Sequence, residues 1–178
     1  MLGEADGHGK VRYSAVNSCI RLAHSIDGMA LWTAEDLAED PLIQPVTAST
    51  QPAEGSSLHP VQEAMVQCHG SQCGFCTPGF VMSLFGMYQN TPHGKGITRE
   101  QAQVDLSGNL CRCTGYRPIL DAAQQMASLP GMAVNEAEVL QKLKLLAQEQ
   151  SAQAANLSYI APTSQAGAWP SSTGNGTA

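Results

Sequence analysis

Four cysteines in two close pairs constrain the fold of this chain more than any other sequence feature. Cys73 and Cys76 lie in the run CGFC, and Cys111 and Cys113 lie in the run CRC. Two such pairs can converge on one site, where four thiolates favour zinc or an iron-sulfur cluster over hard cations. The chain is therefore expected to bring together two loops that lie far apart in the sequence.

The spacing of the pairs leaves two metal species open. A single zinc ion needs all four sulfurs around one atom, whereas a [2Fe-2S] cluster takes two sulfurs at each end. Helix starts are expected directly after each pair, at Thr77-Pro78 and within 114–118, and their dipoles would stabilise a negatively charged cluster. The electrostatics thus favour the cluster, and Arg112 or Arg117 should raise its reduction potential.

Composition and charge exclude several classes of partner. The 178 residues carry a net charge of -6 and a sequence pI near 5.2, so no basic surface for nucleic acid is expected. No apolar stretch is long enough to cross a membrane, and the first residues do not resemble a secretion signal. We expect a cytoplasmic protein whose cysteines bind metal rather than form disulfides.

Apolar periodicity predicts a mainly α chain. Pro60 and Gly70 suit the start and stop of one helix, Thr77 is the expected cap of the next, and Thr98 with Gln101 forms a capping-box signature. Two further helices are expected within 116–129 and 135–150. The short strands expected are the runs VRYSAVNSCI and MALWT.

The remaining thiol and imidazole candidates favour structural roles. Cys68 falls on the buried face of its predicted helix, where a free thiol behaves as a small apolar side chain. His59, His69 and His93 lack the regular spacing of a metal site, so capping, exposure or core hydrogen bonding is expected instead.

Taken in full, the two cysteine motifs resemble a known family. HGSQCGFCTPGFVMS followed by LSGNLCRCTGYRPILDA is similar to the helical [2Fe-2S]-binding domain of the xanthine dehydrogenase and molybdenum hydroxylase family, in its small, iron-sulfur subunit form. The resemblance runs from about Val11 to about Leu129. It implies a [2Fe-2S] cluster, held in a four-helix-bundle-like domain that follows a short β remnant of a ferredoxin domain.

The resemblance also implies roles for individual residues. The family's motif cysteines ligate the cluster nearest the molybdenum cofactor, which implies that Cys73, Cys76, Cys111 and Cys113 are the ligands here. The glutamine before the first cysteine contacts the pterin in the family, which implies that role for Gln72. The surroundings of Cys113 touch the pterin as well, so electrons are expected to enter there.

The family pattern further implies a division of the chain. Residues 1–40 resemble the end of a plant-type ferredoxin domain, 41–57 a linker, 58–150 the cluster domain, and 151–178 a disordered tail at the truncated start of a flavin domain. The upstream Cx4CxxC loop of the ferredoxin domain is missing, so Cys19, which matches its fourth ligand, is expected to be a free thiol. The sequence is interpreted as an internal fragment or truncated product without a flavin site.

The expected function is electron transfer within a xanthine dehydrogenase-like oxidoreductase. A molybdenum-cofactor-binding large subunit would hydroxylate a purine or related heterocycle, as in purine catabolism, and this chain would pass electrons toward FAD and NAD on a flavin-binding domain or subunit. The chain itself carries no catalytic residues of its own that we identify, and molybdopterin is expected on the partner. The alternatives are a zinc-stabilised helical interaction module and a non-functional fragment.

Overall fold

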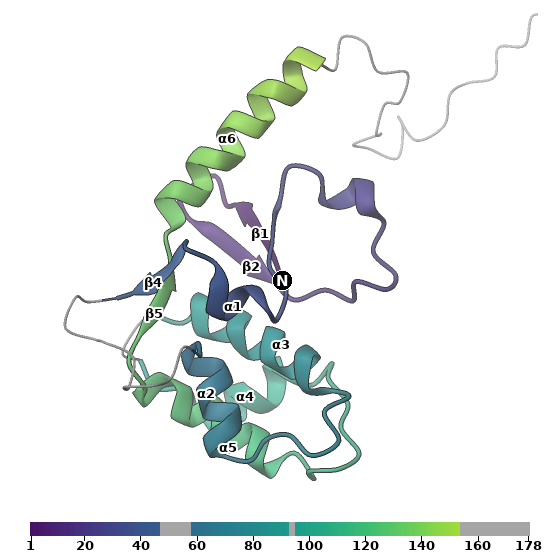
Figure 1. Cartoon of the computed structure of the whole chain (residues 1–178), viewed down its shortest axis with the longest axis vertical. Helices are drawn as coiled ribbons and strands as arrows, with labels where there is room; N and C mark the ends of the chain where they lie inside the picture. The colour runs from purple at the N-terminus through teal and green to yellow at the C-terminus, as the bar shows by residue number, and fades with distance from the viewer. Residues whose placement is uncertain (47–57, 93–94, 154–178) are drawn as a thin grey trace, which may run out of the picture.

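Helices dominate the computed structural model of the protein, which describes residues 1–46, 58–92 and 95–153 (Figure 1). The elements follow in the order β1 (Leu2–Ala5), β2 (Val11–Ser14), η1 (Ala23–Ile26), β3 (Ala30–Leu31), α1 (Asp36–Glu39), β4 (Ile43–Pro45), α2 (Pro60–Gln67), α3 (Thr77–Asn90), α4 (Arg99–Asp105), α5 (Arg117–Gln125), η2 (Met126–Ser128), β5 (Met132–Val134) and α6 (Glu136–Gln153). The prediction of a mainly α fold with a small β part is confirmed. The four-helix-bundle-like arrangement stays a prediction.

The helix α3 forms the centre of the helical layer because it is apolar on a wide face. It packs against α2, while α5 packs against both α2 and α4. The side chains that α3 buries are Phe80, Val81, Leu84, Phe85, Met87 and Tyr88. Burying several large side chains of this kind contributes about 1.5 to 3 kcal/mol each.

Two of the helix starts carry a side-chain cap, whereas the start of α3 does not. His59 caps α2, where its Nδ1 accepts a hydrogen bond from Val61 N at 3.2 Å, and the Gln62 side chain accepts from the His59 backbone N–H at 3.0 Å. Thr98 caps α4 by accepting from Gln101 N at 3.1 Å, as expected. The expected cap at Thr77 is wrong, because Thr77 is the first helical residue of α3 and its hydroxyl contacts Ser71 instead.

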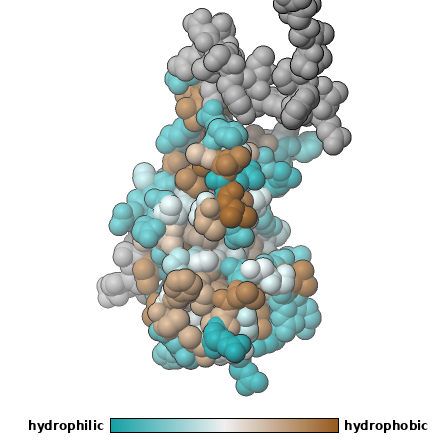
Figure 2. Space-filling model, turned by 90° about the vertical axis from the view of Figure 1, so that its right-hand side faces the viewer, coloured by the Kyte–Doolittle hydropathy of each residue, from teal (hydrophilic) through white to brown (hydrophobic). Residues whose placement is uncertain are grey.

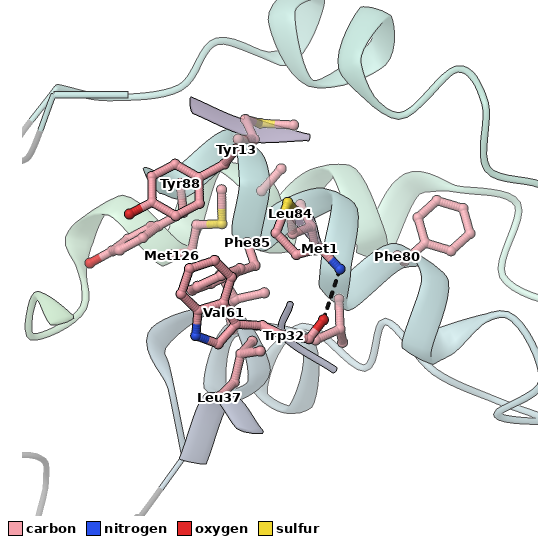
Figure 3. Close-up of a cluster of buried hydrophobic side chains, with 14 of the residues drawn as sticks. Met1, Tyr13, Trp32, Leu37, Val61, Phe80, Leu84, Phe85, Tyr88 and Met126 are labelled. Carbon is pink, nitrogen blue, oxygen red and sulfur yellow. Dashed lines mark hydrogen bonds between the residues drawn. The ribbon is translucent and has the colours of Figure 1, made fainter. Parts of the chain in front are cut away.

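A small sheet at the N-terminus closes one side of the core. Its three antiparallel strands run in the order β2-β1-β3, with Leu2 opposite Ser14 in one pair and opposite Leu31 in the other. The Met1 ammonium donates to the Trp32 carbonyl at 2.8 Å, and the Met1 side chain lies against Gly86 of α3 (Figure 3). The strand β1 was not predicted, whereas β2 and β3 fall within the two expected strand segments.

Aromatic rings join this sheet to the helices in one core. The Tyr13 ring packs edge-on against Phe85 with centroids 6.3 Å apart, and the Trp32 ring lies 6.5 Å from the same phenylalanine. His59 packs edge-on against Phe85 and Tyr88 from the other side. Residues of the predicted segments 1–40 and 58–150 therefore share a hydrophobic core in the described structure (Figure 3).

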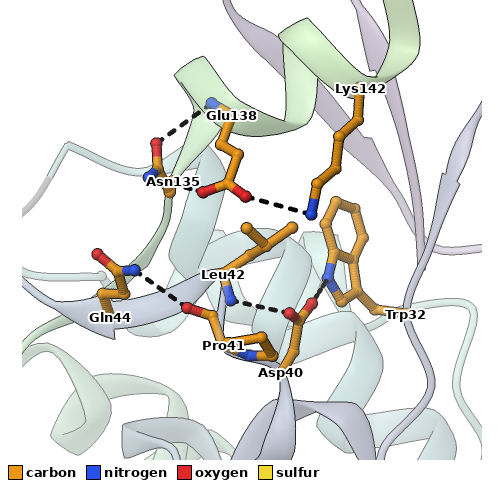
Figure 4. Close-up of polar contacts among 8 residues, drawn as sticks. All are labelled: Trp32, Asp40, Pro41, Leu42, Gln44, Asn135, Glu138 and Lys142. Carbon is orange, nitrogen blue, oxygen red and sulfur yellow. Dashed lines mark hydrogen bonds and ion pairs between the residues drawn. The ribbon is translucent and has the colours of Figure 1, made fainter. Parts of the chain in front are cut away.

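A second, two-stranded sheet corrects the expectation of a linker over 41–57. The strand β4 pairs antiparallel with β5, with Ile43 opposite Val134, and both side chains are buried. Polar contacts fix this sheet in place: the Asp40 carboxylate accepts from Trp32 Nε1 at 2.7 Å and from Leu42 N at 2.8 Å (Figure 4). The proline pattern did not reveal the strand because its partner lies far downstream. The rest of this segment, 47–57, lies outside the described residues.

The last helix extends away from the body of the molecule (Figure 1). Asn135 caps α6, its Oδ1 accepting from Glu138 N at 3.3 Å, and Lys142 forms an ion pair with Glu138 at 3.2 Å (Figure 4). The helix continues to Gln153, so the expected start of a disordered tail at residue 151 is wrong for its first three positions. The predicted tail over 154–178 lies outside the described residues.

Apolar side chains also reach the surface. Ile20 and Leu22 are exposed in the segment between β2 and β3, and Figure 2, which faces that side, shows hydrophobic patches separated by hydrophilic ones. In the part of the chain that the structure describes, no helix is long and apolar enough to span a lipid bilayer.

Candidate metal centre

The first cysteine loop joins α2 to α3. The helix α2 ends when His69 adopts a left-handed conformation, with φ 55°, and Gly70 N then donates to Met65 O at 2.8 Å. Gly74 has φ 83°, a conformation that favours glycine, and Thr77 N donates to its carbonyl at 3.2 Å. The chain therefore turns sharply between Cys73 and Cys76 and enters α3 directly.

The second cysteine loop joins α4 to α5 and is tied to α3. Ser83 Oγ of α3 donates to Asn109 Oδ1 at 2.9 Å, which holds the start of the loop. Cys111 N donates to the Tyr116 hydroxyl at 3.0 Å, which closes the loop on itself. The Tyr116 ring packs edge-on against Phe80 at the start of α3, with centroids 6.3 Å apart. Both loops thus lie at the same end of the helical layer (Figure 1).

The four predicted cysteines meet as two pairs, each with one thiol from each loop. Cys76 and Cys111 lie close enough to shift each other's pKa, and both are partly buried and pack against the hydrophobic core; we call these the inner pair. Cys73 and Cys113 likewise lie close enough to shift each other's pKa, and both are exposed; we call these the outer pair. The two loops therefore lie next to each other, and the assignment of these four cysteines as metal ligands stays a prediction.

The pKa values of the two thiols in each pair are shifted in opposite directions. Hydrogen bonds from the Thr114 side chain and backbone lower the pKa of Cys111 to about 7, whereas burial raises the pKa of Cys76. The backbone N–H of Phe75 lowers the pKa of Cys73, and the hydrogen bond to Cys73 raises the pKa of Cys113. A thiolate is the form that binds metal, so one residue of each pair is prepared for ligation.

The fit of these residues to a [2Fe-2S] cluster follows from the donor set. Four thiols in two pairs match the requirement for two sulfurs at each iron. Within the described residues, no three or more Cys, His, Asp or Glu side chains converge so as to hold one metal ion. The α3 and α5 helices begin at Thr77 and Arg117, just after the two cysteine motifs, as the sequence predicted. Their positive ends suit a negatively charged group.

The other candidate residues surround this site or lie away from it. Gln72 is exposed at the entry to the first motif, and Arg112 and Arg117 are exposed beside the second, so their expected roles stay predictions. Cys68 is half-buried and donates from Sγ to Gln125 Oε1 at 2.8 Å, as its structural interpretation expects. Cys19 is exposed and belongs to neither thiol pair.

The three histidines considered in the sequence analysis differ in their places in the structure. His59 is buried and caps α2, which was one of the structural roles expected of it. His69 ends α2 through its backbone. His93 lies outside the described residues.

Sequence analysis missed two residues that shape the site. Thr114 contacts the Cys111 sulfur through its hydroxyl at 3.3 Å and its backbone N–H at 3.5 Å. Tyr116 adopts φ 68°, which is unusual for a bulky side chain and found mostly where the surrounding structure enforces it. The sequence TGYRP signals a turn before a helix, but not which groups would reach the sulfur.

Comparison with known proteins identifies the domain. Residues 33–124 match the sequence pattern of the [2Fe-2S] binding domain, which is more than half of the chain. The chain belongs to the [2Fe-2S] binding domain family. Its relatives place it among the iron-sulfur domains of the molybdenum hydroxylases, as its two cysteine motifs indicated.

Three relatives illustrate the similarity. The chain is 37% identical to a xanthine dehydrogenase from Oryza sativa subsp. japonica over 130 residues, which cover 73% of this chain and 8% of that protein. It is 46% identical to a xanthine dehydrogenase from Blastobotrys adeninivorans over 65% of this chain and 7% of the relative. It is 40% identical to an aldehyde oxidase from Homo sapiens over 68% of this chain and 8% of the relative. The chain thus spans less than a tenth of these relatives.

A solved structure is also similar in part. The crystal structure of quinoline 2-oxidoreductase from Pseudomonas putida 86 matches with a TM-score of 0.49 and 30% sequence identity. The match covers 64% of this chain and 60% of the other.

Proposed function

We propose that the chain holds one [2Fe-2S] cluster on Cys73, Cys76, Cys111 and Cys113 and transfers electrons within a molybdenum hydroxylase. The observation that carries this proposal is the pairing of the four thiols across the two loops, Cys73 with Cys113 and Cys76 with Cys111. Two pairs suit two irons, whereas a zinc ion would need four ligands around one atom. The bound group would supply reversible one-electron exchange.

The residues of the chain would bind, orient and partly shield the group. The inner pair is packed against the core, so it would fix one side of the cluster rigidly to α3 and α5. The outer pair is exposed, so it would face a partner. Electron transfer needs such an exposed side because its rate depends on close approach, and this supports entry of electrons at Cys113.

The expected partners are a molybdenum-cofactor-binding large subunit and a flavin-binding domain or subunit. Support comes from the relatives, in which the matching segment is a small part of a much larger protein. Electrons would pass from the molybdenum centre through this domain toward FAD and NAD, during oxidation of a purine or related heterocycle. Gln72 would contact the pterin, because it precedes Cys73 on the exposed side of the site. We further propose residues 58–150 as the cluster domain and a cytoplasmic location.

The test is electron transfer from a molybdenum subunit. The chain is co-expressed with a xanthine dehydrogenase large subunit, and reduction of the cluster after mixing with xanthine is followed anaerobically by stopped-flow absorbance. The proposal predicts co-purification and bleaching of the cluster by substrate. A purified complex whose cluster stays oxidised while xanthine is consumed would refute the electron-transfer role.

A matched pair of variants tests the assignment of Gln72. Q72A is expected to leave the cluster spectrum unchanged and to slow its reduction by substrate at least tenfold, since a small displacement of reacting groups can cost about that much or more. Q44A is the control, because Gln44 is exposed on β4, away from both cysteine loops (Figures 1 and 4). Loss of the cluster from Q72A would show a structural role instead.

A further inference from the structure

A relay of hydrogen bonds ends on one sulfur of the site. The backbone N–H of Tyr116 donates to Thr114 Oγ1 at 3.2 Å, and Thr114 Oγ1 lies 3.3 Å from Cys111 Sγ. The backbone N–H of Thr114 donates to the same sulfur at 3.5 Å. One residue therefore directs both a hydroxyl and an amide at Cys111.

The relay fixes the direction in which the hydroxyl donates. A threonine hydroxyl has one proton to donate and two lone pairs that can accept. Here one lone pair accepts the hydrogen bond from the Tyr116 N–H. A cysteine that ligates iron is a thiolate and has no proton to donate. In the cluster-bound site, the hydroxyl proton of Thr114 must therefore point at Cys111 Sγ.

Tyr116 holds the relay in place from its other end. Its hydroxyl accepts from Cys111 N at 3.0 Å, so residues 111–116 form a closed ring of contacts. Gly115, with φ 66°, turns the chain so that the Tyr116 N–H points back at Thr114, and Tyr116 itself adopts φ 68° just before α5 begins. The Tyr116 ring lies against Phe80, which ties this conformation to α3. An enforced backbone of this kind is typical of sites that position a group.

The arrangement distinguishes Cys111 from the other three cysteines. Among the described residues, none of the hydrogen bonds to Cys73, Cys76 or Cys113 comes from a side-chain hydroxyl. Both Cys111 and Thr114 are only partly exposed, which strengthens the contact relative to a fully exposed one.

We propose that Thr114 is a positioning residue that raises the reduction potential of the cluster by donating its hydroxyl proton to Cys111 Sγ. The inference rests on the proposed function. Reduction adds one electron to the cluster, breaks no bond and makes the sulfurs more negative. A donor to sulfur therefore stabilises the reduced form more than the oxidised form.

The test is a potentiometric titration of the full chain, with dithionite supplying the electron and the signal of the reduced cluster followed by electron paramagnetic resonance. T114V removes the hydroxyl and keeps the backbone N–H, T114A does so with a smaller side chain, and T114S restores the hydroxyl. S71A is the matched control: the Ser71 hydroxyl contacts Thr77 at 2.7 Å in the other cysteine loop.

The expected result is a lower potential in T114V and T114A. At a fixed ambient potential the ratio of reduced to oxidised cluster should fall about tenfold, equivalent to about 59 mV for a one-electron couple. T114S and S71A should keep the potential of the unmodified chain. Resonance Raman spectra should show a stronger terminal iron-sulfur bond in T114V, since donation weakens that bond.

Three results would overturn the inference. A cluster-containing T114V with an unchanged potential would show that the hydroxyl does not tune it, while leaving the proposed function intact. Loss of the cluster from both T114V and T114A, with retention in T114S, would assign the hydroxyl to assembly instead. An unmodified chain that takes up no iron would overturn this inference and the proposed function together.

Discussion

The inner and outer cysteine pairs each join the first cysteine loop to the second, but their surroundings in the fold are very different. Cys76 and Cys111 are partly buried against the core, whereas Cys73 and Cys113 are exposed at the tips of their loops. The difference teaches that one end of the site belongs to the folded body and the other end to the surface. The inner pair should therefore govern stability, and the outer pair should govern exchange with a partner.

The largest expected effect comes from replacing one residue of each pair. C111S should reduce iron content more than about tenfold and lower the melting temperature clearly, because second-shell changes alone can cost about 10- to 100-fold in metal affinity. C113S should lose the cluster more easily than the unmodified chain but keep more of its melting temperature. Iron analysis and thermal unfolding check both. Equal losses of melting temperature in C111S and C113S would contradict this difference between the inner and outer pairs.

The next largest effect concerns the pH dependence of the free energy of unfolding, which we expect to arise from a buried histidine rather than from surface groups. Burial lowers the pKa of His59 to about 3, from an ordinary value of 6.5. The unfolded chain therefore binds a proton below pH 6.5 that the folded chain does not, so the free energy of unfolding falls as the pH drops. Between pH 7.5 and pH 5.5 the loss should be about 1.4 kcal/mol.

A variant isolates this contribution. H59N keeps a side-chain acceptor at the cap of α2 but cannot titrate, so urea unfolding should show a flatter pH dependence even though the lost ring lowers its stability throughout. An H59N chain with the same slope as the unmodified chain would assign the pH dependence to other groups.

Two tyrosine variants distinguish a contact that closes the second cysteine loop from a contact that stabilises the fold elsewhere, and their effects should be smaller. Y116F removes the acceptor for the Cys111 N–H and should cost about 1 kcal/mol, with a change in the visible spectrum of the cluster. Y88F is the matched control, since the Tyr88 hydroxyl accepts from Met132 N at 3.2 Å away from the cysteine loops. Y88F should cost a similar amount and leave the spectrum unchanged. Denaturant unfolding and absorbance distinguish the two.

The smallest effect on stability is expected from an exposed ion pair between α4 and α5, the helices on either side of the second cysteine loop. Arg99 of α4 forms an ion pair with Asp121 of α5 at 2.6 Å, and both side chains are partly exposed. R99Q should cost no more than about 0.5 kcal/mol, because exposed ion pairs contribute little. A large loss of cluster in R99Q would show that this contact positions Cys111 and Cys113.

The fold was predictable from the sequence where the signals are local. The start of α2 follows from the proline signal at Pro60, the start of α4 follows from the capping signal at Thr98, and the buried face of α3 follows from its apolar spacing. The strands β4 and β5 were not predictable, because Ile43 and Val134 form strands by pairing with each other and packing into the core, across a long separation in the chain. Local pattern does not contain such contacts.

The neighbourhood of the two cysteine loops was predictable, but its detail was not. The two motifs predicted that Cys73 and Cys76 lie near Cys111 and Cys113, and their role as cluster ligands stays a prediction. The pairing of one thiol from each loop, and the difference in burial between pairs, depend on how α3 and α5 lie. The role of Thr114 depends on the turn at Gly115 and Tyr116, both of which have positive φ, and local sequence does not reveal which groups that turn brings together.

The most direct test of the account is chemical analysis of the purified chain for iron and acid-labile sulfide, with an electron paramagnetic resonance spectrum before and after reduction. The account predicts two irons and two sulfides per chain, and a signal that appears on uptake of one electron. A soluble, folded chain that contains one zinc ion, or no metal at all, would contradict it.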